Sequence, residues 1–120
     1  MTIQPPSPKP NSPTVPLTQE ARAAYEKLYD ECELAIQGTI DPNILQVLND
    51  AEAPIVDILD KDDVCRLEAD TVLFQELRVQ INDANETLKD LKSQIAAIAS
   101  HIATAGEILA AIDKVLTIVP

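Results

Sequence analysis

The sequence predicts an all-α protein, and three observations lead to that fold class. Aromatic residues make up only 2 % of the chain, whereas strands favour aromatic and β-branched side chains. Only two glycines occur in 120 residues, and an all-β chain of this length would need many more turn residues. Apolar residues also recur in steps of four and three along most of the chain, the spacing of one helix face. We therefore expect one helical domain over residues 17–120.

The first 16 residues form a separate, proline-rich segment that contains six of the nine prolines. Proline has no backbone N–H and biases the residue before it away from the helical region. Residues 1–16 are therefore expected to be a disordered tail. The repeated Pro-x-x-Pro spacing is compatible with a partner that recognises proline-rich segments.

A first helix is expected over residues 18–37. Thr18 is a suitable N-cap, and Gly38 supplies a C-terminal stop. One apolar stripe runs along this segment, through Ala21, Tyr25, Leu28, Cys32 and Ala35.

A second helix is expected over residues 42–60. Asp41 provides the N-cap, and Pro42 occupies the first helical position, where proline is favoured. Pro54 interrupts the segment, which predicts a kink or a break there. Asp62 and Asp63 are expected to cap the next helix.

A third helix is expected over residues 63–119, with an apolar stripe that Asp70 alone interrupts. A repeat of 3.5 residues sustained over six heptads is typical of a coiled-coil or bundle seam. One arrangement is a continuous helix of about 85 Å on which the two shorter helices pack. In the other, the helix folds back near Ser100–Gly106 and closes a four-helix bundle. The unbroken spacing of the apolar residues favours the continuous helix.

The seam predicts a surface for association with other helices. Two helices of about 30 Å each leave part of an 85 Å stripe bare, and exposed apolar stripes favour association. The stripe widens beyond Gln94, which predicts that the C-terminal third has several neighbours. The expected interface residues are Leu77, Ile81, Leu88, Leu91, Ile95, Ile98, Ile102, Leu109, Ile112 and Leu116.

The net charge of −11 argues against nucleic acid as a partner and against an anionic membrane surface, since both are negative. It is compatible with a small acidic inhibitor, immunity-type or chaperone-like protein that binds a basic partner. The long C-terminal helix leaves a membrane-active component of a pore-forming assembly as a further alternative. The polar N-terminus shows no secretory signal, so we expect a cytoplasmic protein.

No catalytic, cofactor-binding or metal-binding residues are predicted. His101 is the one histidine, so the Glu-x-x-His pairs of a di-iron bundle and the ligand sets of zinc sites are missing from the sequence. Cys32 falls on an apolar helical position and is expected to be a buried thiol. The leading hypothesis is a non-enzymatic assembly or adaptor subunit without a cofactor, which associates with itself or with another helical protein.

Overall fold

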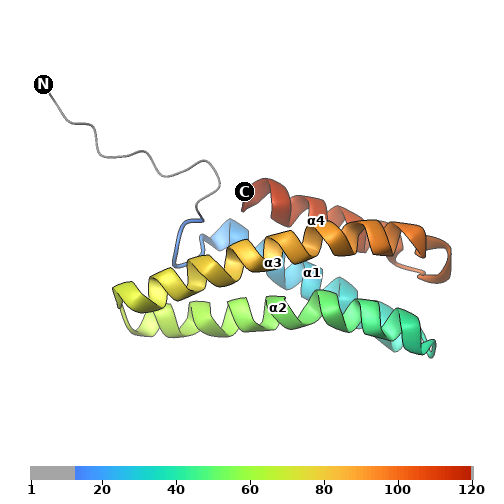
Figure 1. The fold of residues 1–120 in the computed structure, drawn as a ribbon, viewed down its shortest axis with the longest axis horizontal. Coiled ribbons are helices and arrows are strands. Elements are labelled where there is room, and N and C mark those ends of the chain that lie inside the picture. Colours follow the sequence, from blue (N-terminus) through green and yellow to red (C-terminus); the bar gives the residue numbers. More distant parts are fainter. Residues whose placement is uncertain (1–12, 120) are drawn as a thin grey trace, which may run out of the picture.

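The computed structural model of the protein describes residues 13–119, which form four α-helices and one short 3₁₀ helix, with no strand in that range (Figure 1). This confirms the predicted all-α class. The elements are α1 (Gln19–Gln37), α2 (Pro42–Leu67), α3 (Thr71–Ala97), η1 (Ala99–His101) and α4 (Ala105–Ile118).

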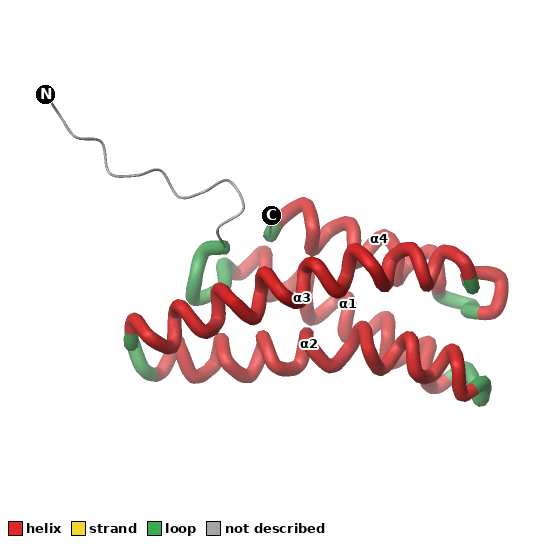
Figure 2. The backbone as a smooth tube through the Cα atoms, in the orientation of Figure 1, coloured by secondary structure: helices red, strands yellow, loops and turns green. Residues whose placement is uncertain are grey.

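The helices form a closed bundle in which each runs antiparallel to the next along the chain (Figure 2). α1 packs against α2 and α4, and α3 packs against the same two helices. The bundle measures 60 × 30 × 20 Å. Because α2 and α3 are the longest helices, their connecting turn projects past the start of α1 and the end of α4 (Figure 1).

α1 follows the sequence prediction closely. The Thr18 hydroxyl oxygen accepts a hydrogen bond from the Ala21 N–H at 3.1 Å, which satisfies one of the free donors of the first turn. At the other end, the Gly38 N–H donates to the Ala35 carbonyl at 3.1 Å. The helix therefore begins directly after its predicted cap and ends directly before its predicted stop.

α2 is longer than predicted and passes through Pro54 without a break. Proline removes the hydrogen bond to the carbonyl four residues earlier. That carbonyl belongs to Asp50, an exposed residue, so water can replace the missing donor. The predicted end at residue 60 and the predicted cap at Asp62–Asp63 are both wrong, because these residues lie inside the helix.

The predicted continuous helix over residues 63–119 is also wrong, because the chain turns twice within it. The first turn, residues 68–70, ends at Asp70, whose Oδ1 accepts a hydrogen bond from the Val72 N–H at 2.7 Å. The one polar interruption of the stripe is therefore a helix N-cap. The second turn, residues 98–104, contains η1, and Gly106 lies after it within α4. The folded-back arrangement is the one that the structure adopts.

The apolar repeat alone does not reveal the second turn, which the sequence allowed only as the alternative near Ser100–Gly106. The turn contains seven residues, 98–104, so the spacing of apolar residues in the sequence continues across it. Ile102 is buried even within the turn, with 6 % of its surface exposed. α4 then places Ile108 and Val115 in the core. Folding back thus gives the wide C-terminal stripe two neighbours, α1 and α3.

The N-terminal tail was predicted over residues 1–16, of which residues 1–12 lie outside the described part of the chain. The last four predicted tail residues do contact the bundle. Pro13 is buried, and Val15 packs on the core together with Leu17. The helical domain therefore begins earlier than the proline content indicates.

Candidate binding surfaces

The ten residues predicted as an association seam lie inside the bundle. Seven of them are buried, namely Leu77, Ile81, Leu88, Leu91, Ile95, Ile102 and Ile112. Three are partly buried against the same core, namely Ile98, Leu109 and Leu116. The protein's own helices cover the stripe, so in this structure its side chains are not available to a second chain. Any binding surface must therefore be sought on the outside of the bundle.

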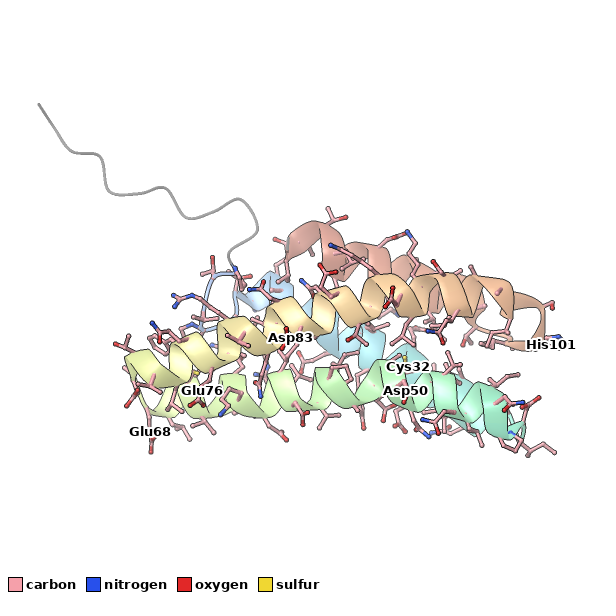
Figure 3. The ribbon with its side chains drawn as sticks, viewed as in Figure 1. Cys32, Asp50, Glu68, Glu76, Asp83 and His101 are labelled. Carbon is pink, nitrogen blue, oxygen red and sulfur yellow. The ribbon has the colours of Figure 1, made fainter. Side chains whose placement is uncertain are left out.

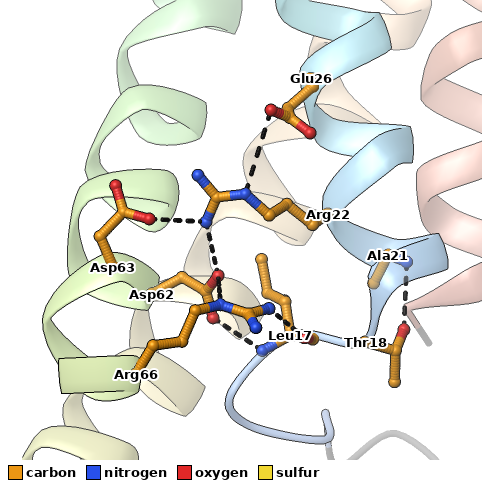
Figure 4. Close-up of polar contacts among 8 residues, drawn as sticks. All are labelled: Leu17, Thr18, Ala21, Arg22, Glu26, Asp62, Asp63 and Arg66. Carbon is orange, nitrogen blue, oxygen red and sulfur yellow. Dashed lines mark hydrogen bonds and ion pairs between the residues drawn. The ribbon is translucent and has the colours of Figure 1, made fainter. Parts of the chain in front are cut away.

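A buried carboxylate, Asp62, joins the N-terminal segment to α1 and α2 (Figure 4). Its side chain is fully buried, and its Oδ1 accepts a hydrogen bond from the Leu17 N–H at 2.7 Å. Its Oδ2 accepts from Arg22 Nη1 at 2.6 Å and from Arg66 Nε at 2.8 Å. Arg66 Nη2 also donates to the Leu17 carbonyl at 2.5 Å. Asp63, next to it, is exposed and reaches only Arg22, at 2.9 Å.

The Asp62 cluster has a structural role that sequence reasoning missed. Both oxygens of the buried carboxylate accept hydrogen bonds, from the Leu17 N–H and from the two arginines. The signal was present, because Asp62 continues the apolar phase of α2 between Ile58 and Cys65. An acid at a core position needs buried partners, since an isolated buried charge is very costly.

A second buried polar residue, Asn85, ties α1 and α3 to the end of α4. The Tyr25 hydroxyl donates to Asn85 Oδ1 at 3.0 Å, and Asn85 Nδ2 donates to the Val119 carbonyl at 2.6 Å. Burial raises the pKa of Tyr25, so the phenol stays protonated as a donor. Asn85 is buried, with only 6 % of its surface exposed.

The outer face of α1 and α2 gathers negative charge around one tyrosine. Burial, and then the neighbouring Glu33 carboxyl through hydrogen bonding and repulsion, raises the pKa of Glu52 to about 7. Glu33, followed by Glu52, raises the pKa of Tyr29 on the same face. Residues 28–60 contain eight Asp and Glu and no Lys or Arg. Of these eight carboxylates, Glu31 pairs with Lys27 at 2.8 Å, and the other seven form no ion pair with any residue between 13 and 119.

The two cysteines are free and buried. Burial, and then the charge of Glu52, raises the pKa of Cys32 to about 12, which confirms its predicted place in the core. Cys65 lies near the C-terminal end of α2, because the helix start expected at Asp62–Asp63 is not present. Burial raises its pKa as well. Neither thiol has the lowered pKa that nucleophilic cysteines require.

A shallow groove of about 520 Å³ runs between α1 and α4. Its floor is made of small side chains and its rim of charged ones. The alanines are Ala23, Ala24, Ala110 and Ala111, and the charged residues are Glu20, Lys27, Glu107 and Lys114.

The remaining polar side chains do not converge on a chemical site. Over residues 13–119, no group of three or more His, Cys, Asp or Glu is placed to hold a metal ion. Figure 3 shows Asp50, Glu76 and Glu68 spread along the α2–α3 side of the bundle, and His101 at the tip of the α3–α4 turn. His101 is exposed.

No helix in the described part of the chain combines the length and the apolar character needed to cross a membrane. No protein-family model, no curated protein and no solved structure matches this chain.

Proposed function

We propose that this protein is a non-enzymatic helical interaction module that binds a basic protein segment on the outer face of α1 and α2. The observation that supports this most is the pair Glu33 and Glu52 beside Tyr29. Burial and like charge raise the pKa of Glu52 to about 7, so its ionised form carries an electrostatic penalty. A lysine or arginine placed between the two carboxylates would remove that penalty.

The surrounding surface has the composition of a binding face for cations. Asp30 is exposed on α1 and is among the charges that raise the pKa of Tyr29. Residues 28–60 contain no base that could offset the negative field of Asp30, Glu33 and Glu52. Such a field steers basic partners and raises their association rate. Tyr29 adds an aromatic ring on which an arginine can stack.

A titration with a short peptide of alternating arginine and alanine tests this proposal, with citrulline in place of arginine as the control peptide. We expect the arginine peptide to bind with strong salt dependence and to shift NMR resonances of α1 and α2. The citrulline peptide is expected not to bind, because it is uncharged. Binding is expected to weaken as the pH falls below about 7, where a proton occupies Glu52.

Two matched charge reversals locate the surface. Asp30→Lys with Glu33→Lys changes the acidic face beside Tyr29, whereas Glu86→Lys with Asp90→Lys makes the same charge change on α3. The first pair should lower the affinity for the arginine peptide at least about tenfold more than the second. Equal losses for both pairs would mean that only net charge matters, and the proposed face would be wrong.

A further inference from the structure

We propose that the groove between α1 and α4 is the contact surface for a second copy of this chain, forming a two-fold symmetric dimer. This surface is separate from the α1–α2 face described above and does not depend on its function. The groove presents small side chains along its floor, which allow two helical surfaces to approach closely. Ala23 and Ala110 are both exposed there.

The rim charges alternate around the groove. Because α1 and α4 run antiparallel (Figure 1), Lys27 lies across from Glu107 at one end, and Glu20 lies across from Lys114 at the other. The pKa of Lys27 is raised chiefly by its ion pair with Glu31 and also by the charge of Glu107. The effect of Glu107 agrees with its position across the groove from Lys27. Glu20, Glu107 and Lys114 form no ion pair with any other residue between 13 and 119.

This pattern is complementary to itself under a two-fold rotation. With the axis parallel to the helices, α1 of one copy faces α4 of the other, so Glu20 meets Lys114 and Lys27 meets Glu107. With the axis across the helices, like helices face each other, so Glu20 meets Lys27 and Lys114 meets Glu107. Opposite charges meet in both cases, which is the requirement for an isologous interface.

The groove carries little net charge on a strongly acidic molecule, because Glu31, which pairs with Lys27 at 2.8 Å, adds only one negative charge to those of the residues that line it. Its two acids and two bases cancel, whereas the chain as a whole carries −11. Two copies that approach through a strongly negative face repel each other, and this face keeps that local repulsion small. Leu34, seven residues after Lys27 and therefore on the same side of α1, is 54 % exposed and extends the apolar surface.

The size of the face predicts a weak dimer. α4 has 14 residues, so α1 and α4 together offer a face of roughly 20 × 20 Å. That is about 400 Å² per copy, below the roughly 800 Å² per partner of a standard stable interface. We therefore expect an association that depends on concentration, with monomers prevailing at low concentration.

Sedimentation equilibrium between about 1 µM and 1 mM, at physiological salt to screen distant repulsion, tests the dimer. Interference optics are required because the chain has two tyrosines and no tryptophan. We expect the average mass to rise from one chain toward two. Ala110→Arg should abolish this rise, and Ala53→Arg, the same change at an exposed position of α2, should leave it intact. A wild-type protein that stays monomeric, or a dimer that Ala110→Arg does not weaken, would overturn the proposal.

Charge swaps identify the axis and guard against a misfolded variant. Lys114→Glu alone should weaken the dimer about tenfold or more, because it creates like-charge contacts under either axis. Adding Glu20→Lys should restore it only if the axis is parallel to the helices. Adding Glu107→Lys should restore it only if the axis crosses them. If neither second change restores a dimer in variants with native circular dichroism, the rim charges do not face a second copy and the proposal fails.

Discussion

Replacing Asp62 by alanine should be among the most damaging single changes in this protein. The substitution leaves the Leu17 N–H without its acceptor at 2.7 Å and two arginines without their shared carboxylate. An unsatisfied buried N–H costs about 1–3 kcal/mol. Breaking a fully buried ion pair costs about 3–5 kcal/mol. The arginine side chains are 26 % and 43 % exposed, so water can partly replace the carboxylate, and we expect a total of about 2–4 kcal/mol.

Urea denaturation followed by circular dichroism measures this loss. A domain of this size has a free energy of unfolding of about 5–15 kcal/mol. A loss of 2–4 kcal/mol therefore lowers the midpoint by roughly 1–3 M urea. Asp63→Ala is the matched control, because this neighbouring acid is 58 % exposed and reaches only Arg22. It should cost no more than about 1 kcal/mol.

Hydrogen exchange supplies a local measurement for the same prediction. In the wild-type protein the Leu17 amide should be protected, because it is buried and donates to Asp62. In the alanine variant it should exchange at a rate close to that of a free chain while the α3 amides remain protected. The reasoning is refuted if Asp62→Ala and Asp63→Ala destabilise equally, or if the Leu17 amide exchanges freely in the wild type.

Three further changes test other parts of the fold. Asn85→Ala should lower the free energy of unfolding by about 2–4 kcal/mol, because it leaves the Tyr25 hydroxyl and the Val119 carbonyl without their hydrogen-bond partner. The control Asn82→Ala, at an exposed position of α3, should cost under about 0.5 kcal/mol in the same denaturation assay. The free energy of unfolding should fall as the pH rises from about 4.5 to about 7, because in this window the folded state holds a proton on Glu52 that the unfolded state has already released. Glu52→Gln should remove this part of the pH dependence, and an unchanged profile would contradict it. A Cβ at Gly106 meets nothing within 4 Å, so Gly106→Ala should raise the thermal midpoint by an amount equivalent to about 0.5–1 kcal/mol, whereas a lower midpoint would show that the turn needs this glycine.

The sequence predicts the helical segments well because periodicity reports which face of each helix is buried. It predicts their connections less well, because a turn that preserves the period leaves no trace in the pattern. Residues 98–104 span one heptad, so the apolar repeat favoured a continuous helix over the fold-back near Ser100–Gly106. Residues 68–70 leave a trace, since Asp70 interrupts the stripe, but an acid there also fits an exposed position of a continuous helix. Only packing against α1 and α2 decides between a turn at residues 68–70 and a continuous helix.

The candidate surfaces were harder to predict than the fold. The seam residues share one pattern whether their neighbours belong to the same chain or to another, so periodicity alone cannot assign the partner. Asp62 was detectable as an acid at a core position of α2. The α1–α4 groove was not, because it depends on which helices become neighbours after the chain has folded back.

A zero-length carbodiimide cross-link between Lys92 and Asp113 tests most directly whether α4 folds back on α3 of the same chain. Lys92 Nζ lies 2.5 Å from Asp113 Oδ1, whereas a continuous helix would separate these residues by about 32 Å (21 residues at 1.5 Å each). Mass spectrometry of an equal mixture of ¹⁴N- and ¹⁵N-labelled protein distinguishes links within a chain from links between chains. We predict that the cross-linked peptides carry one isotope only. Absence of the link, or links that join the two isotopes, would contradict the closed single-chain bundle.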